Sequence, residues 1–343
     1  MTIEATSAQF EHRYDAIDVA NKNSFYMTDS DRPFTVAVSV HSIGQPREKI
    51  IPDVQLPEEV AERRRRNTAS ISDETNRAAR FILAGNMSTI VRDGKAAFGP
   101  EAMTSDERLA DARENMNTHL KNLGIDPAAV RILNPDRDYS TPLVAVNVDE
   151  DPTTYDGVEP ARLEGQGDFL YTYNPDIVLA ARPADCPIAI MTAETPRGRV
   201  HMLLHFAWKG PASGQYDDMQ REFDALEIDH ESLRVYITPG GHAETFRYKG
   251  YVPDGEKNPQ IEEGRLFVGI TDEATMGDQK KYSFGIDTPH DVYQAFIDMG
   301  LDPKQLFLDT TDTTALDAGH GSNSRAINQL EDNVRDLVTA QFN

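Results

Sequence analysis

The residues best suited to chemistry are gathered in one segment, ADCPIAIMTAETPRGRVHMLLHFAWKG, residues 184–210. It holds the only cysteine and the only tryptophan of the chain, and two of its nine histidines. Two apolar runs, PIAIMTAE and GRVHMLLHF, flank a short turn that contains Pro196, and this pattern predicts an antiparallel hairpin. Counting outward from the turn places Cys186 within a residue or two of His205, and Cβ atoms opposed across such a pair lie about 5 Å apart.

A thiol beside an imidazole supports two chemistries, a shared metal ion such as zinc or a thiolate–imidazolium pair. The spacing of Cys186 and His205 permits both and selects neither. A single cysteine cannot form an intramolecular disulfide. The alternative without chemistry is a buried free cysteine next to a hydrogen-bonded core histidine.

The residues that follow His205 suggest binding groups. Gly210 and Pro211 are typical of a helix start, whose free amides, with Lys209 beside them, favour a small anion such as phosphate. Trp208 offers a flat apolar surface for a purine ring, although a tryptophan near a strand end is commonly part of the core. Together these features predict a pocket.

Strands and helices must alternate to position this segment. Apolar patterns predict strands at residues 33–46, 142–148, 176–182 and 233–239, and helices at residues 105–126, 212–228 and 289–300. No internal repeat or low-complexity linker divides the chain. We therefore predict one α/β domain over residues 76–343, with residues 1–75 as an N-terminal extension packed on the core.

The composition of the chain limits the kinds of partner that it can bind. The chain is 39% hydrophobic and 27% charged, which is typical of a globular protein, and its formal net charge is −23. This charge repels phosphate backbones and anionic lipid, so a nucleic-acid polymer or a membrane surface is not expected as partner. The N-terminus lacks a signal-peptide pattern, and no run approaches the roughly 20 apolar residues of a membrane span. We expect a cytoplasmic protein that binds a small molecule.

The segment that contains Cys186 and His205 also resembles the sequence motifs of a known protein family. PADCPIAIM followed by VHMLLHFAWKG resembles the T-A-D-C-x-P and H-A-G-W-R-G pattern of the laccase-domain family, whose members are also called YfiH-like or multicopper polyphenol oxidase-like. Further segments agree in order: GNMSTIVRDG, DERLADARENMNTHLKNLGID, GDFLYT, VYITPGGHAETF and SNSRAIN. The resemblance implies a single three-layer α/β domain with mixed β-sheets, similar to the cysteine hydrolase fold of cytotoxic necrotizing factor.

The resemblance also implies an activity. Family members hold zinc through one cysteine and two histidines and cleave purine nucleosides with phosphate, and some also deaminate adenosine. By the motif match, Cys186 is the cysteine ligand and His205 one histidine ligand. Asp185 is a candidate acid/base group or a residue that holds the turn. Phe206 and Trp208 are candidates for the wall that contacts the base.

The chain departs from the family at the first ligand. Where the family has a histidine after the helix at residues 105–126, this chain reads Asn134, Pro135, Asp136, Arg137. A carboxylate can bind zinc, so Asp136 is the first candidate substitute, His242 the second and His320 the third. The candidate phosphate ligands are Arg137, Lys209 and Arg325.

The most probable function on these residues is a divergent purine nucleoside phosphorylase-like enzyme that takes a purine nucleoside and phosphate and uses zinc. Two other functions stay open. One is a cysteine–histidine hydrolase or deamidase with Cys186 as nucleophile and His205 as base. The other is a non-catalytic binding descendant of the family. Copper oxidation is the least favoured, because a blue-copper site needs two histidines beside the cysteine.

Overall fold

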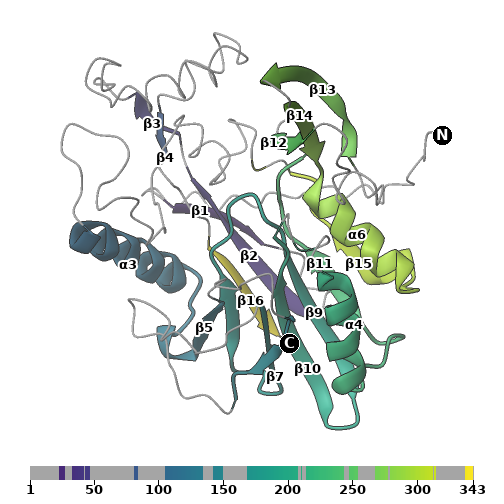
Figure 1. Cartoon of the computed structure of the whole chain (residues 1–343). Helices are drawn as coiled ribbons and strands as arrows, with labels where there is room; N and C mark the ends of the chain where they lie inside the picture. The colour runs from purple at the N-terminus through teal and green to yellow at the C-terminus, as the bar shows by residue number, and fades with distance from the viewer. Residues whose placement is uncertain are drawn as a thin grey trace.

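The computed structural model describes a large part of the chain (Figure 1). The described residues are 23–27, 33–41, 43–46, 81–83, 105–133, 142–149, 168–207, 210, 214–242, 247–253, 267–276, 279–311, 313 and 337–342. No helix in these ranges is long and apolar enough to cross a membrane.

Two mixed β-sheets form the centre of the fold. The six-stranded sheet has the order β15 (Leu306–Leu308), β11 (Arg234–Ile237), β9 (Ile188–Thr195), β10 (Gly198–His205), β7 (Phe169–Thr172) and β6 (Ala145–Asn147). The five-stranded sheet has the order β1 (Asn23–Met27), β2 (Phe34–His41), β16 (Val338–Phe342), β8 (Val178–Ala181) and β5 (Val130–Leu133). Each sheet combines antiparallel pairs with parallel ones, β11–β15 and β6–β7 in the first and β5–β8 in the second.

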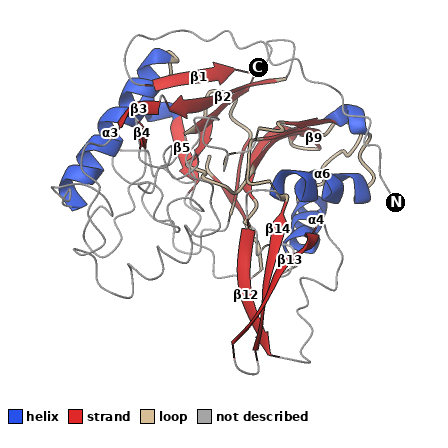
Figure 2. Cartoon of the chain, turned by 90° about the horizontal axis from the view of Figure 1, so that it is seen from above, coloured by secondary structure: helices blue, strands red, loops and turns tan. Residues whose placement is uncertain are grey.

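In the described part of the chain, three α-helices cover the outer faces of the sheets. Helix α3 (Ser105–Asn122) packs on the five-stranded sheet through Met116 and Leu120. Helices α4 (Gln215–Ala225) and α6 (Thr288–Asp298) pack on the six-stranded sheet, with Phe223 and Phe296 in its core cluster. Figure 2 shows α3 on one side of the two sheets and α4 and α6 on the other.

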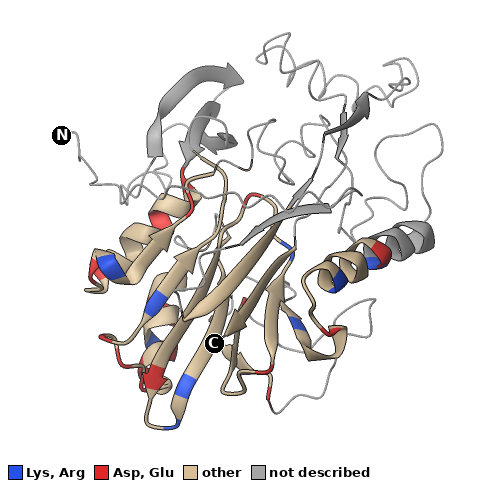
Figure 3. Cartoon of the chain, turned by 180° about the vertical axis from the view of Figure 1, so that it is seen from behind, with Lys and Arg blue, Asp and Glu red and all other residues tan. Residues whose placement is uncertain are grey.

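The mixed α/β class expected from the sequence is therefore confirmed. Helices lie on both outer sides of a pair of sheets, which gives one layer more than the three expected. Figure 3 shows the charged residues of the described part on the helices, in the loops and near the strand ends. In the six-stranded sheet, side chains on one face join the core cluster with α4 and α6, and side chains on the other face join the core cluster between the two sheets.

Smaller elements complete the described part. A three-stranded antiparallel sheet, order β12-β14-β13, extends from the sandwich in Figure 2. Its strands are Arg247–Pro253, Gln279–Ile286 and Phe267–Met276. A short pair joins β3 (Ile43–Pro46) to β4 (Phe81–Leu83), and two 3-10 helices span Pro127–Ala129 and Pro303–Gln305.

Residues near the N-terminus take part in the main sandwich. Strand β2 lies between β1 and β16, and its Phe34, Val36 and Val38 are at most 1% exposed, in the core between the two sheets. These residues fall inside the segment 1–75 that we expected to pack on the domain as an extension. Part of that segment is thus an inner strand of a sheet, while the boundary at residue 75 stays a prediction.

The predicted hairpin is confirmed as β9 and β10. Its register pairs Thr195 with Gly198 at the turn and Ile188 with His205 at the far end. Along β9, Ile188 and Ile190 face the other sheet and Ala189 and Met191 face the helices. The strand is therefore buried on both faces, which explains its continuous apolar sequence.

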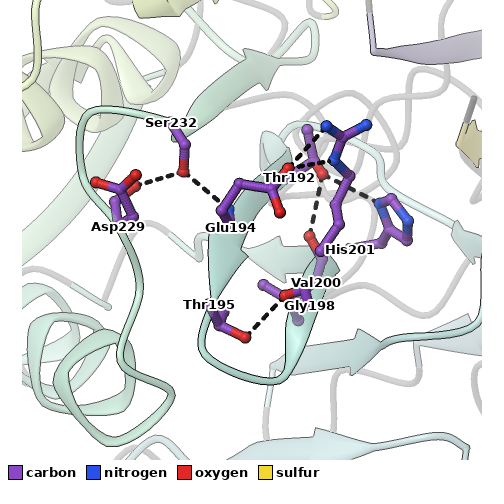
Figure 4. A network of polar contacts seen from close by, with 9 residues as sticks. Thr192, Glu194, Thr195, Gly198, Val200, His201, Asp229 and Ser232 are labelled. Atoms are coloured by element: carbon purple, nitrogen blue, oxygen red, sulfur yellow. Dashed lines mark hydrogen bonds and ion pairs between the residues drawn. The ribbon is translucent and has the colours of Figure 1, made fainter.

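A polar network holds the hairpin near its turn (Figure 4). The hydroxyl of Thr192 lies 3.1 Å from Nδ1 of His201 and donates to the carbonyl of Val200, also at 3.1 Å. The His201 ring stacks on Phe342 of β16 with ring centroids 4.0 Å apart, so it lies between the two sheets. Burial, assisted by the positive charge of Arg199, lowers the pKa of His201 to about 4.

This burial predicts acid sensitivity. Below pH 6.5 the unfolded chain protonates His201 while the folded chain does not, so stability falls as the pH drops toward about 4. At about 1.4 kcal/mol per pKa unit, the loss is about 3 kcal/mol. His201→Phe keeps the stacking and should remove this part of the loss, as measured by urea unfolding between pH 7 and pH 4. If the free energy of unfolding fell equally with pH in the wild type and in His201→Phe, His201 would not be the cause of the acid sensitivity.

Candidate functional site

Five strands of the six-stranded sheet bring their ends together opposite the β9–β10 turn (Figure 1). Strands β10, β11 and β15 end there, and the antiparallel strands β9 and β7 begin there. The residues that flank these strand ends, 184–187, 205–207, 238–242, 309–311 and 313, therefore meet at one edge of the sheet, the edge formed by the strand ends.

Cys186 and His205 lie in contact at this edge. His205 is the last residue of β10 and is 8% exposed, while Cys186 is partly exposed and lies close enough to the imidazole to raise its pKa. The Cys186 turn is tied to β10 because the amide of Phe206 donates to the carbonyl of Pro187 at 3.0 Å. The predicted proximity of the thiol and the imidazole is confirmed.

Asp168 completes the surroundings of His205. Its carboxylate Oδ1 lies 3.2 Å from Nδ1 of His205, and its side chain is fully buried. The main-chain amide of His205 also donates to the carbonyl of Asp168 at 2.8 Å. Sequence reasoning did not single out this residue, although the segment GDFLYT that contains it was aligned with the family.

The ionisation of His205 reflects these neighbours. Burial disfavours the charged ring, but the hydrogen-bond and electrostatic contributions of Asp168 and Cys186 outweigh it. Together they raise the pKa of His205 to about 10.

Asp185 joins three connecting segments. Its carbonyl accepts from the amide of Gly241 at 2.8 Å and from the hydroxyl of Thr288 at 3.2 Å, and its carboxylate accepts from Thr313 at 3.2 Å. These contacts fit the role of holding the turn before Cys186. The acid/base role also considered for Asp185 stays a prediction.

His242 lies in a different cluster. Its Nδ1 is 3.8 Å from Oδ2 of Asp287, whose Oδ1 accepts from Nδ1 of His290 at 2.7 Å, and the two imidazole centroids are 5.8 Å apart. Within the described ranges, no three side chains of the histidine, cysteine, aspartate or glutamate type are placed to hold one metal ion. The structure therefore does not bring His242 to Cys186 and His205 as a third ligand.

Two of the described residues have side chains of the kinds that bind zinc. A thiol and an imidazole whose other nitrogen contacts a carboxylate match the donors and the outer partner found in zinc proteins. The remaining candidate ligands, Asp136 and His320, lie outside the described residues, as do Trp208, Lys209, Arg137 and Arg325.

Phe206 faces away from the thiol. It follows His205 along the chain and points to the opposite face of the sheet, where it packs against Tyr216 and Phe296 with centroids 5.8 and 6.3 Å away. At 2% exposed it belongs to the core under α4 and α6. The structure does not bring Phe206 together with Cys186 and His205, as a wall contacting the base would require.

Comparison with known proteins agrees with this geometry. Residues 92–321 match the family model described as multi-copper polyphenol oxidoreductase laccase, which is more than half of the chain. The chain belongs to this family. No curated protein matches it.

Solved structures show the shared fold at low sequence identity. The YfiH hypothetical protein of Bacillus licheniformis is 14% identical, with a TM-score of 0.56 over 94% of this chain and 97% of its own. YlmD from Geobacillus stearothermophilus is 13% identical, with a TM-score of 0.57 over 95% and 98%. A Neisseria meningitidis protein is 16% identical, with a TM-score of 0.53 over 93% and 99%.

The Asp287 contacts predict the titration of His290. The hydrogen bond to Asp287 raises the pKa of the His290 imidazole against the opposing effect of burial. Asp287→Asn keeps a side chain able to cap α6 but removes the charge, so the pKa of His290 should fall toward its ordinary value. Histidine NMR titration measures this change. The control is Asp298→Asn, at the exposed far end of α6, and an equal pKa in both variants would refute the pairing.

Proposed function

We propose that the chain is a divergent purine nucleoside phosphorylase-like enzyme. One observation carries this proposal: Cys186 and His205, the two residues that match the ligand motif of the family, are in contact at the edge of the sheet where five strand ends meet. The substrates would be a purine nucleoside and phosphate, with adenosine deamination as a further activity. We propose the cytoplasm as the place of action.

The chain's own residues suit a zinc ion. Sγ of Cys186 and the imidazole nitrogen of His205 that faces it would be two ligands, with Asp136 as the proposed third. Bound zinc supplies Lewis-acid chemistry toward a substrate or water oxygen. The partial exposure of Cys186 leaves this end of the site accessible to a small molecule.

The substrate contacts follow the sequence. We propose that Trp208 contacts the base and that Arg137, Lys209 or Arg325 binds phosphate. In phosphorolysis a phosphate oxygen bonds to the anomeric carbon, the N-glycosidic bond breaks, and the base leaves with its nitrogen protonated. Phe206 has an indirect role in this proposal. It follows His205 in the chain and packs in the core rather than beside the thiol.

A second function has an observation in its favour. A partly exposed thiol beside a buried imidazole is also the arrangement of a cysteine nucleophile and its base. A cysteine–histidine hydrolase or deamidase would use the same two residues without a metal. In that case alkylation of Cys186 by iodoacetamide should abolish the activity of protein treated with a chelator.

The decisive experiment is chromatography of purified protein incubated with adenosine, inosine, guanosine or methylthioadenosine, with and without phosphate. We expect phosphate-dependent release of free base. Cys186→Ala should lower the rate roughly 100-fold or more, since even outer partners of a metal site commonly contribute 10- to 100-fold.

The matched control is His201→Phe, a buried histidine on the same strand and the same face but away from the strand end. It should keep the wild-type rate at neutral pH. The phosphorylase proposal would be overturned if the protein cleaved none of the four nucleosides. It would also be overturned if the Cys186→Ala variant released free base as fast as the wild type. The hydrolase and the binding-only functions would then be the ones to separate.

A further inference from the structure

We propose that Asp168 is a positioning residue that fixes the orientation of His205, so that one ring nitrogen faces Cys186. The inference rests on the proposed function only in taking Cys186 and His205 as the reactive pair. It holds whether the thiol binds a metal or attacks a substrate, because both require the same ring nitrogen to face the thiol.

Two contacts of different kinds connect Asp168 to His205. Strands β7 and β10 are paired up to Phe169 and Leu204, and the amide of His205 continues the ladder by donating to the carbonyl of Asp168 at 2.8 Å. This main-chain bond fixes the separation of the two residues. The side chains then meet on the same side, with Oδ1 of Asp168 3.2 Å from Nδ1 of His205.

The side-chain contact assigns the two ring nitrogens. A carboxylate accepts hydrogen bonds, so Nδ1 of His205 must carry a proton to donate to Asp168. Cys186 lies beside the same ring, and with Nδ1 engaged by Asp168 the nitrogen left for the thiol is Nε2. Carboxylates on the far nitrogen of metal-binding or catalytic histidines have this orienting effect.

A purely structural role explains Asp168 poorly. Its carboxylate is fully buried, and Oδ2 has no hydrogen-bond partner within the part of the chain that the structure describes. A buried carboxylate held by few partners is costly. Asp309 shows the structural alternative: it is also buried, but its two oxygens accept from the Thr311 amide at 2.9 Å and the Tyr236 hydroxyl at 3.1 Å.

The test compares Asp168→Asn with Asp309→Asn, which changes a buried carboxylate at the same edge of the sheet without touching His205. Histidine-selective ¹⁵N NMR reports which ring nitrogen carries a proton, with the His205 signals assigned through His205→Gln. The rate of Cys186 alkylation by iodoacetamide is measured at a fixed neutral pH in the presence of EDTA, so that a metal cannot shield the thiol.

We expect a protonated Nδ1 on His205 in the wild type and in Asp309→Asn, and a changed Nδ1 signal in Asp168→Asn. Alkylation should slow roughly tenfold or more in Asp168→Asn only. If Asp168 had only a structural role, both Asp168→Asn and Asp309→Asn would have a lower melting temperature. The two variants would then not differ in Nδ1 protonation or in the alkylation rate. Unchanged Nδ1 protonation and alkylation in a folded Asp168→Asn variant would overturn the proposal.

Two provisions keep the test decisive. If Asp168→Asn does not fold, an unprotonated Nδ1 on His205 in the wild-type spectrum still contradicts the assignment, and Asp168→Glu supplies the variant for the comparison of alkylation rates. Asp168→Glu keeps the charge and should restore part of the alkylation rate if the carboxylate acts through the ring. Neither measurement uses a nucleoside. A negative phosphorylase assay therefore does not contradict the role of Asp168, and a negative result for Asp168 does not change the outcome of the phosphorylase assay.

Discussion

The pairing of β9 with β10 is the constraint on which the site depends. These strands lie in the interior of the six-stranded sheet, with apolar side chains buried on both faces, so the pairing cannot slip without exposing one set and burying the wrong one. The same register that pairs Ile188 with His205 places Cys186 just beyond the last pair. Core packing therefore sets the distance between the thiol and the imidazole before any ligand contributes.

The edge of the sheet is held mainly by main-chain bonds. The amides of Thr238, Gly241 and Thr313 donate to the carbonyls of Ile188, Asp185 and Gly240, at 2.9, 2.8 and 3.0 Å. Gly240 has no room for a side chain, because a Cβ there would lie 2.8 Å from Cγ of Pro289 and 3.1 Å from the carbonyl oxygen of Asp185. These main-chain hydrogen bonds and close contacts restrict movement of the segments at the strand ends. Such rigidity suits a site whose side chains must keep a fixed geometry.

The sequence predicted what depends on local pattern. The hairpin, the helices at α3, α4 and α6, and the contact of Cys186 with His205 all follow from periodicity and turn chemistry. Asp168 was missed because it meets His205 through the pairing of β7 with β10, which joins residues far apart in the chain. Likewise β2 pairs with β16, near the opposite terminus, and no local signal announces that. Phe206 is different, since strand alternation already places it on the face opposite His205.

The departure at Asp136 bears on how the proposed site would work. In the family the resemblance implies one thiolate and two neutral imidazoles around zinc, which leaves the centre with a net positive charge. A carboxylate in place of one imidazole lowers that charge by one unit, and this weakens both Lewis acidity and attraction for phosphate. In a chain whose formal net charge is −23, phosphate binding then depends more heavily on cationic side chains. Under the proposed function that role falls to the three cationic candidates, Arg137, Lys209 and Arg325, of which Arg137 is adjacent in sequence to the substituted position.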